Sequence, residues 1–546
     1  MSVEARKQSS PAVIIRPPPE PLTTTTTKSG TVKLTSFDRE FVKVPFTALL
    51  VFEHMGQHEA IDNIKRALSQ ALVHYYPFAG HIISSGAVDH AEFSISCTGD
   101  GVEFLTASMD CSLKEAKILD QSSSGKINAM LDELAILYSG WSYGFDDPLL
   151  SMQVTEFSCG GFVLGVTWNH AIADGVGIAQ FLAAVGELAR GSPSPSVVPT
   201  RWDDAVSKLQ PWPNPIRQAM LLCPEPQGSE LIVPLDITIP SALINRVKAE
   251  YYHSCSGFDG QQPCTVFEAV LAVLWRCHVR ATMSSNNSGN PVYITFATNM
   301  RKYVGAKDGY YGNCIANHLL TMATRSAVAE AGILDLIRMI KRAKDQLPDK
   351  VKTGNRSGND DQQMQGLRER YDMMHVSSWR NVGFEQVDFG GGAPARVMFH
   401  ARGGAPPVPM CIMSASPNQL GFPTLRRIYP LPAAGTVLLP PLAPAAPAAR
   451  QGSSPARPAA LPRRLALHHR PNHHLRRSAP PHPRPWDLGT PQNLTSTTSA
   501  TTPAGGDLTA GRSAHRNDVL SCVWVDTSHD STSLLLSQHH TLLTSG

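Results

Sequence analysis

Apolar side chains in the first 190 residues recur with two different periods. Residues 46–52 (FTALLVF) and 162–168 (FVLGVTW) are apolar runs that predict buried strands. Residues 60–76 place apolar side chains on one helical face, starting at Ile61, and residues 175–188 are apolar at helical spacing. The alternation of strand and helix predicts a mixed α/β fold for this part of the chain.

A stretch without either period separates this first half from a second one. Residues 191–215 are rich in Pro, Ser and Trp and predict a crossover between two domains. Beyond them, strands are predicted near residues 230–235 and 292–297, and helices near residues 265–279 and 327–347. No internal repeat of 20 to 50 residues is visible.

Five segments follow from these patterns. They are an extended lead-in at 1–30, an N-terminal domain at 31–190, a crossover linker at 191–225, a C-terminal domain at 226–417, and a low-complexity, disordered tail at 418–546.

The composition of the tail differs from that of the preceding chain. Residues 421–546 contain no Lys or Glu, but 12 Arg, 5 Asp, 17 of the 43 prolines and 9 of the 20 histidines. Two interpretations compete, a basic functional arm and out-of-frame translation of a GC-rich gene, and the total loss of Lys and Glu favours the second. The histidine pairs at 468–469 and 473–474 lack a closed ligand set around them, so no metal site is predicted.

Whole-chain features exclude several classes of protein. The formal net charge of +3 argues against a nucleic-acid-binding protein. The chain contains no run of about 18 apolar residues, so no membrane span is predicted. The N-terminus lacks the apolar region of a secretory signal. The ten cysteines contain no CxxC pair, which favours reduced thiols and a cytoplasmic location.

Candidate chemistry lies just after the second predicted strand, in the segment Trp168-Asn-His-Ala-Ile-Ala-Asp-Gly. His170 ends an apolar strand, Asp174 follows four residues later, and Gly175 allows a sharp turn. Imidazole is well suited to general-base catalysis near neutral pH. The alternative interpretation is a core histidine followed by a turn-forming Asp-Gly pair, and the spacing alone does not separate the two.

Further motifs lie before and after this segment, spread over about 350 residues. They are Leu34-Thr-Ser-Phe-Asp38, Tyr76-Pro-Phe-Ala-Gly80, Phe267-Glu268 with Trp275-Arg276, Asn299-Met-Arg301, Gly309-Tyr-Tyr-Gly-Asn313 and Asp388-Phe-Gly-Gly-Gly392. Together with the His170 segment, this set resembles the HxxxDG, YPLAG, GYxGN and DFGWG motifs of the plant BAHD acyltransferases. His81 stands where that family has Arg, and Gly391 where it has Trp.

The resemblance implies a fold and a reaction. The fold is two chloramphenicol-acetyltransferase-like domains of mixed sheets and helices with a channel between them. The reaction is acyl transfer from an acyl-CoA co-substrate to the hydroxyl or amine of a small-molecule acceptor, with His170 as general base and no bound cofactor. Hydroxycinnamoyl or benzoyl donors are implied first, then acetyl and malonyl, and the enzyme would be a monomer.

It also implies roles for other residues. Asp174 would pair with Arg301 and hold the loop around His170, the alternative for Arg301 being a solvated surface charge. Trp379 and Ser377 would lie in the acyl pocket and donate hydrogen bonds to the oxyanion, the alternative being a packed tryptophan and a turn serine. Asp388, Phe389, Gly390 and Gly392 would shape the CoA end of the channel.

Two departures oppose an active enzyme. Gly391 removes a large packing side chain, and no closing strand is predicted after residue 417. An inactive remnant of the family is therefore the alternative to an active acyltransferase. A nucleic-acid-associated protein acting through the Arg-rich tail is a third and weaker hypothesis, because the tail lacks Lys and interleaved aromatic residues.

Overall fold

The structure is a computed structural model. It describes residues 7–19, 30–42, 44–56, 60–85, 92–119, 129–138, 144–209, 214–222, 232–255, 262–322, 324–346, 349, 364–367, 372–400, 408–415, 423–430, 437–438 and 521–522.

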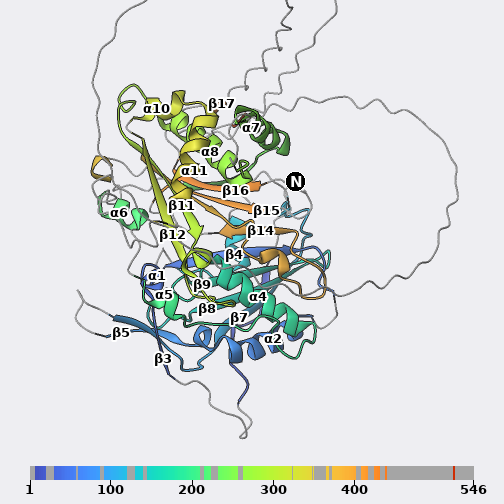
Figure 1. Ribbon diagram of the computed structural model, residues 1–546. Coiled ribbons are helices and arrows are strands. Elements are labelled where there is room, and N and C mark those ends of the chain that lie inside the picture. The colour runs from blue at the N-terminus through green and yellow to red at the C-terminus, as the bar shows by residue number, and fades with distance from the viewer. Residues whose placement is uncertain are drawn as a thin grey trace, which may run out of the picture. The chain divides into compact units, whose positions relative to one another are not determined.

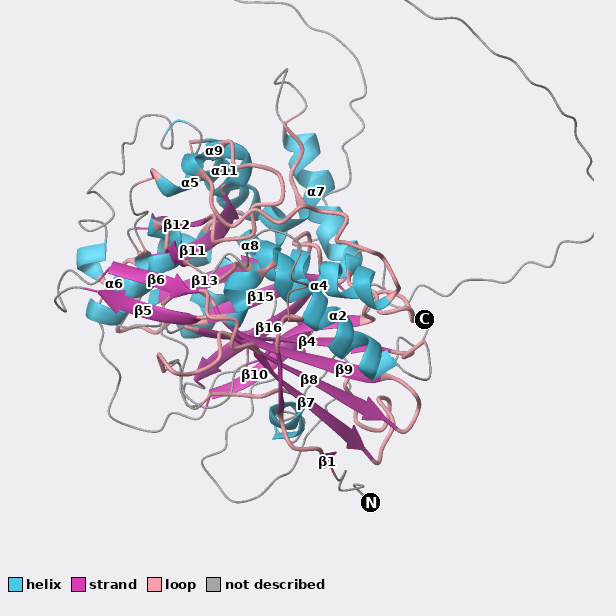
Figure 2. Cartoon of the chain, turned by 90° about the horizontal axis from the view of Figure 1, so that it is seen from below, coloured by secondary structure: helices cyan, strands magenta, loops and turns pink. Residues whose placement is uncertain are grey.

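A mixed seven-stranded sheet forms the core of the first half (Figure 1). Its strands are β1 (Lys7–Ser9), β2 (Val13–Ile15), β4 (Pro45–Phe52), β7 (Val102–Met109), β8 (Leu150–Phe157), β9 (Phe162–Asn169) and β14 (Arg396–His400). The order is β1-β7-β8-β9-β4-β14, with β2 also paired to β7. Helices α2 (Ala60–His74) and α4 (Gly175–Ala189) lie side by side over one face (Figure 2).

The continuous apolar run of β4 reflects burial on both faces of this sheet. Ala48, Leu50 and Phe52 pack into the core beneath α2 and α4. Leu49 and Val51 point to a second cluster on the opposite face. A strand covered on both sides loses the apolar–polar alternation of a half-exposed strand.

A mixed six-stranded sheet forms the core of the second half. Its strands are β10 (Ile232–Thr238), β11 (Val292–Asn299), β12 (Ile315–Met322), β13 (Met373–Ser378), β15 (Met410–Ala415) and β16 (Pro423–Pro430), in the order β10-β16-β15-β13-β11-β12. Helices α7 (Ser241–Ser254), α8 (Val266–Thr282), α10 (Arg325–Glu330) and α11 (Ile333–Asp345) share one apolar core with it.

Smaller elements complete the described chain. A three-stranded sheet contains β3 (Thr31–Lys33), β6 (Glu92–Ser96) and β5 (His81–Ser85). The short helices are α1 (Ser36–Arg39), α5 (Asp204–Ser207), α6 (Pro215–Leu222), α9 (Arg301–Val304), η1 (Tyr76–Ala79), η3 (Asp132–Leu134), η4 (Met364–Gly366) and η6 (Phe384–Gln386), and the last short strands are β17 (Val437–Leu438) and β18 (Ser521–Cys522).

The structure differs from the expected domain plan at two strands. β14 comes from the expected C-terminal domain, yet it pairs with β4 in the first sheet. β16 lies beyond residue 417, yet it pairs with β10 and β15 in the second sheet. The expectation that no closing strand follows residue 417 is therefore wrong. The rest of the expected tail, with its histidine pairs, lies outside the described residues apart from β17 and β18.

Two further expectations change in detail. The helix expected over 327–347 is two helices, because the chain is extended at Ala331 and Gly332 starts a new helix as its N-cap. The lead-in is partly integrated into the fold, since β1 and β2 pair with β7. The crossover linker expected at 191–225 contains both α5 and α6.

Candidate active site

His170 lies in the turn between β9 and α4. Its backbone N–H donates to the carbonyl of Val44 at 2.9 Å. The side chains of the neighbouring residues also hold the turn: Asn169 Oδ1 accepts from the N–H of Ala171, and Trp168 Nε1 donates to the carbonyl of Ala173. The turn is thereby fixed to β9 and to the residue that precedes β4, and His170 is only 5% exposed.

Aromatic rings surround the imidazole. The ring centroids of Phe41 and Phe46 lie 4.2 Å and 4.5 Å from that of His170. Burial lowers the pKa of His170 to about 4, although the carboxylates of Asp174 and Asp38 act in the opposite direction. The imidazole is therefore neutral at neutral pH and able to accept a proton.

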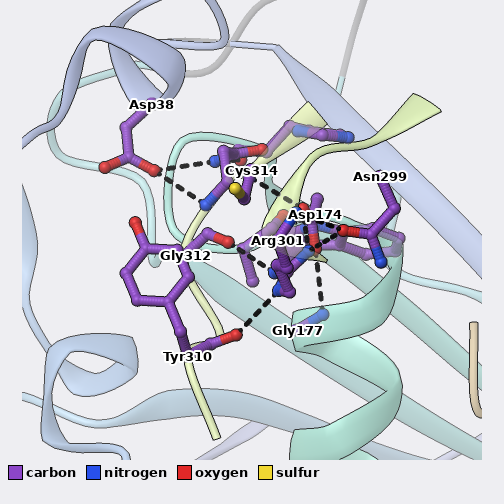
Figure 3. Close-up of polar contacts among 12 residues, drawn as sticks. Asp38, Asp174, Gly177, Asn299, Arg301, Tyr310, Gly312 and Cys314 are labelled. Atoms are coloured by element: carbon purple, nitrogen blue, oxygen red, sulfur yellow. Dashed lines mark hydrogen bonds and ion pairs between the residues drawn. The ribbon is translucent and has the colours of Figure 1, made fainter. Parts of the chain in front are cut away.

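Asp174 begins α4 as its N-cap and forms an ion pair with Arg301 (Figure 3). Both of its carboxylate oxygens accept from the guanidinium at 2.9 Å. The backbone N–H groups of Gly177 and Cys314 donate to the same carboxylate at 3.0 Å and 2.9 Å. Four donors thus hold Asp174 at the helix N-terminus, where the helix dipole also favours a negative charge.

Arg301 also binds the turn that contains the GYYGN segment. Its Nε donates to the carbonyl of Tyr310 at 2.9 Å, and its Nη2 to the carbonyl of Gly312 at 2.7 Å (Figure 3). The side chain of Asn299 accepts from the Arg301 backbone N–H. The Asp174–Arg301 pair therefore joins the His170 loop to two segments of the second half of the chain.

A second buried network supports the same loop, and sequence reasoning gave it no role. Asp38, fully buried, accepts from Arg201 Nη2 at 3.0 Å and from the backbone and side-chain N–H groups of Asn313, both at 3.0 Å. Asn313 Nδ2 also donates to the carbonyl of His170 at 2.8 Å. Asp38 and Asn313 belong to recognised motifs, but Arg201 lies in the crossover, where no local pattern marks it.

The glycine that the local structure requires is Gly177, not Gly175. Gly175 is the first residue of α4 and has no positive φ, and a Cβ there would meet only Val382, at 3.8 Å. A Cβ on Gly177 would lie 1.9 Å from the carbonyl oxygen of Tyr311. The expectation that Gly175 enables a sharp turn is therefore wrong, and the close backbone approach requires glycine at 177.

A cavity of about 230 Å³ opens beside His170. Both halves of the chain line it, and Ser377 and Trp379 lie on its wall together with Asp174 and Gly175. The ring of Trp379 contacts Phe384 and Phe399 at centroid distances of 5.4 Å and 5.9 Å. The predicted base and the predicted oxyanion donors therefore share one cavity.

The DFGGG segment lies elsewhere, at the other end of α4. The Asp388 side chain accepts from the N–H groups of Gly390 and Gly392 at 2.8 Å, and its backbone carbonyl accepts from Arg190, just after α4. Phe389 packs on Phe52 at a centroid distance of 5.5 Å. None of these DFGGG residues lines the His170 cavity.

The space beside Gly391 is filled by backbone. A Cβ on Gly391 would lie 2.2 Å from the carbonyl oxygen of His54, so no side chain fits without movement of that loop. The departure from the tryptophan of the family is therefore matched by close approach of residues 54–56.

Two further properties of the described residues bear on the class of site. No group of three or more His, Cys, Asp or Glu side chains among them is arranged to hold a metal ion. Within the same residues, no helix combines the length and apolar character that crossing a membrane requires.

Comparison with known proteins identifies relatives along most of the chain. The transferase family matches residues 21–415. Acyl transferase 15 of Oryza sativa subsp. japonica is 40% identical over 411 residues, which cover 73% of this chain and 88% of the relative. A myricetin 3-O-glucosyl 1,2-rhamnoside 6'-O-caffeoyltransferase of Crocosmia x crocosmiiflora is 31% identical over 67% of this chain and 84% of its own. The 3'-N-debenzoyl-2'-deoxytaxol N-benzoyltransferase of Taxus canadensis is 30% identical over 64% and 77%, respectively.

Solved structures share the fold at low sequence identity. Vinorine synthase superposes with a TM-score of 0.57 and 18% identity, covering 77% of this chain and 94% of that one. TRI101 of F. sporotrichioides, solved with coenzyme A and T-2, gives a TM-score of 0.53 and 14% identity, covering 73% and 95%. The family match and the sequence relatives together show that the chain is an acyltransferase of the plant BAHD transferase family.

Proposed function

We propose that this acyltransferase transfers an acyl group from an acyl-CoA thioester to a hydroxyl or amine of a plant specialised metabolite, with His170 as the general base. The observation that carries the proposal is a neutral, buried imidazole in a cavity whose wall also contains Trp379 and Ser377. The caffeoyl- and benzoyltransferase relatives favour hydroxycinnamoyl or benzoyl donors over acetyl or malonyl ones.

The chemistry needs no covalent acyl-enzyme. His170 removes the proton from the acceptor, whose oxygen or nitrogen attacks the thioester carbonyl carbon. The carbonyl oxygen becomes an oxyanion, for which Trp379 Nε1–H and the Ser377 hydroxyl are the proposed donors. The intermediate then breaks its C–S bond, and the leaving thiolate takes the proton from His170 to give free CoA. A positioned general base of this kind contributes about 10²–10⁴-fold to the rate.

The proposal includes assignments that follow from the family. Asp388, Phe389, Gly390 and Gly392 would shape the CoA end of the channel from the far end of α4. The enzyme would act as a monomer in the cytoplasm, with acyl-CoA as co-substrate and no resident cofactor or metal.

An inactive family remnant is the second candidate, favoured by the altered DFGGG segment. The buried networks around His170 are complete, however, and β16 fills the second sheet. These two observations favour the active enzyme.

Release of free CoA by the full-length protein tests the proposal. The panel contains hydroxycinnamoyl, benzoyl, acetyl and malonyl thioesters, each with pooled alcohols, pooled amines or no acceptor. The expected result is acceptor-dependent release with an aromatic donor. A folded, soluble protein that releases no CoA above the acceptor-free reaction would support the inactive remnant.

A further inference from the structure

A second buried histidine, His375, lies on the wall of the cavity that contains His170. It belongs to β13 and is 6% exposed. Its Nδ1 is enclosed without a hydrogen-bond partner, and its ring forms no side-chain hydrogen bond with any residue that the structure describes. Nε2 is therefore the nitrogen through which His375 can reach a molecule in the cavity.

A structural histidine of this protein looks different. His400, buried in β14, places its Nε2 2.7 Å from the carboxylate of Asp132. Buried polar groups in folded proteins are as a rule hydrogen-bonded. Burial lowers the pKa of His375 to about 4, so its ring is neutral and one nitrogen donates while the other accepts. Because the cavity adjoins His375, a bound molecule is the available partner.

His375 lies on the same face of β13 as Ser377, two residues before it along the strand. His375 is in register with Thr295 of β11 and Met410 of β15, whereas Ser377 is in register with Ile412. Residues two apart on a strand are about 7 Å apart along it. A substrate whose reacting group lies between His170 and Ser377 can therefore extend to His375.

The ionisable side chains on the described wall of this cavity are already paired. Asp174 binds Arg301. The carboxylate of Glu40 lies 3.7 Å from the guanidinium of Arg217, whose side chain is 67% exposed. The described wall thus offers no unpaired carboxylate for an ammonium group, and the guanidinium of Arg217 is largely exposed and already lies beside Glu40. A neutral acceptor fits this end of the cavity.

We propose that His375 positions the acceptor, a neutral alcohol that carries a second hydroxyl or ether oxygen, through a hydrogen bond at Nε2. This inference rests on the proposed function and deepens it by naming the acceptor class and a residue that binds it.

The test uses benzoyl-CoA, whose acyl group has no polar substituent, so that an effect of His375 cannot arise from the donor. The acceptors are tyrosol, 2-phenylethanol, which lacks the second hydroxyl, and tyramine, which carries an amine in place of the reacting alcohol. Wild-type protein is expected to prefer tyrosol to 2-phenylethanol by about 5- to 20-fold in kcat/KM, the effect of one hydrogen bond. It is expected to prefer tyrosol to tyramine as well, because the described cavity wall offers no unpaired carboxylate to an ammonium group.

Variants assign the preference to the residue. His375→Leu is expected to raise the KM for tyrosol by about 5- to 20-fold, with unchanged kcat, unchanged KM for benzoyl-CoA and unchanged kinetics with 2-phenylethanol. His375→Gln, whose amide reaches the position of Nε2, should restore tyrosol binding, and His375→Asn should not. His318→Leu is the matched control, because His318 is a buried histidine of the same sheet that stacks on Phe296 and does not line the cavity.

Several results would overturn the inference. If the wild type and the Leu variant prefer tyrosol to 2-phenylethanol equally, His375 does not bind the acceptor. If the Leu variant fails to fold, an equal preference in the Gln and Asn variants has the same meaning. Variants that bind para-hydroxybenzoyl-CoA more weakly than wild type does, while binding benzoyl-CoA equally well, would assign His375 to the donor. Preference for tyramine would contradict the neutral acceptor. Folded wild-type protein that releases CoA with other acceptors of the CoA-release panel but transfers to none of the three would overturn this inference and leave the proposed function standing. No acceptor-dependent release anywhere in that panel would overturn both.

Discussion

At the scale of single residues, the surroundings of the His170 imidazole keep it in the neutral form that can accept a proton. Phe41 and Phe46 exclude the water that would solvate an imidazolium ion, and this desolvation outweighs the opposing effect of Asp174 and Asp38. The carboxylate of Asp174 is directed to Arg301 and two backbone N–H groups. Asp174 is thus a positioning residue for the loop.

The pH dependence of kcat/KM should reflect the lowered pKa of His170. The imidazole accepts a proton only when neutral, which it is above a pKa of about 4. Activity should therefore persist as the pH falls through 6.5, the ordinary value, and decline only towards 4. The measurement is kcat/KM from pH 8 down to the onset of acid unfolding, followed in parallel by tryptophan fluorescence. An acid limb centred near 6.5 in folded protein would contradict this.

Asp174→Ala should act mainly on stability. It leaves the mostly buried Arg301 guanidinium without its carboxylate, and breaking such a pair costs about 3–5 kcal/mol in the free energy of unfolding. Asp62→Ala is the control, because Asp62 forms an exposed pair with Lys65 that is worth about 0–1 kcal/mol. Urea unfolding measures both. Equal stabilities of the two variants would show that the Asp174–Arg301 pair does not hold the loop.

Sequence alone predicted part of this site. The spacing after an apolar strand made His170 and Asp174 candidates, and the family resemblance assigned roles to them and to Arg301. The structure brings Asp174 and Arg301 into one ion pair that supports the loop of His170. Arg201 was not found, because a guanidinium that pairs with a residue 163 positions away leaves no local pattern. His375 was also missed, because no local sequence pattern shows that the fold places it on the cavity wall.

At the scale of secondary-structure elements, the N-terminal turn of α4 packs directly on the backbone of the GYYGN turn. Gly177→Ala should displace Tyr311, weaken the bonds from Gly177 and Cys314 to Asp174, and lower both thermal stability and activity. Gly175→Ala is the matched control. Its Cβ meets only an ordinary contact, and alanine is favoured over glycine in a helix by about 1 kcal/mol. A Gly177→Ala protein as stable and active as Gly175→Ala would refute the close approach.

Elements with a clear hydrophobic pattern were predicted well, whereas strands that are defined by their pairing with other strands were not. The runs at β4 and β9 and the helical faces of α2 and α4 agree with the structure within a few residues. β16 was missed because PTLRRIYP shows no alternation, and its strand geometry follows from pairing with β10 and β15. β14 carries no sequence signal for the sheet that it joins.

At the scale of the whole molecule, the two halves share structure as well as a cavity. β14 gives the first sheet a strand from the second half of the chain. The Asp174–Arg301 pair and the Asp38–Asn313 bonds connect the same halves at the site. The geometry around His170 therefore depends on both sheets being complete.

Truncation tests which part of the C-terminal region the enzyme needs. A chain ending at residue 438 keeps β16 and every described contact of the site, and should remain soluble and active. A chain ending at residue 417 lacks β16, the strand that lies between β10 and β15 in the second sheet. Its absence leaves β10 and β15 with exposed edges that promote aggregation. Gel filtration and CoA release are compared with the full-length protein. A chain ending at residue 417 that matched the longer one would show that β16 is dispensable.

The most direct test of the central claim is the kcat/KM of His170→Ala for the donor and acceptor that give the highest rate. Removal of the general base should lower this value by at least about 10²-fold, with circular dichroism and thermal stability showing a folded protein. His81→Ala, which removes a histidine from an exposed pair with Asp100, should retain wild-type activity. A folded His170→Ala protein with activity close to wild type would contradict the assignment of His170 as the base.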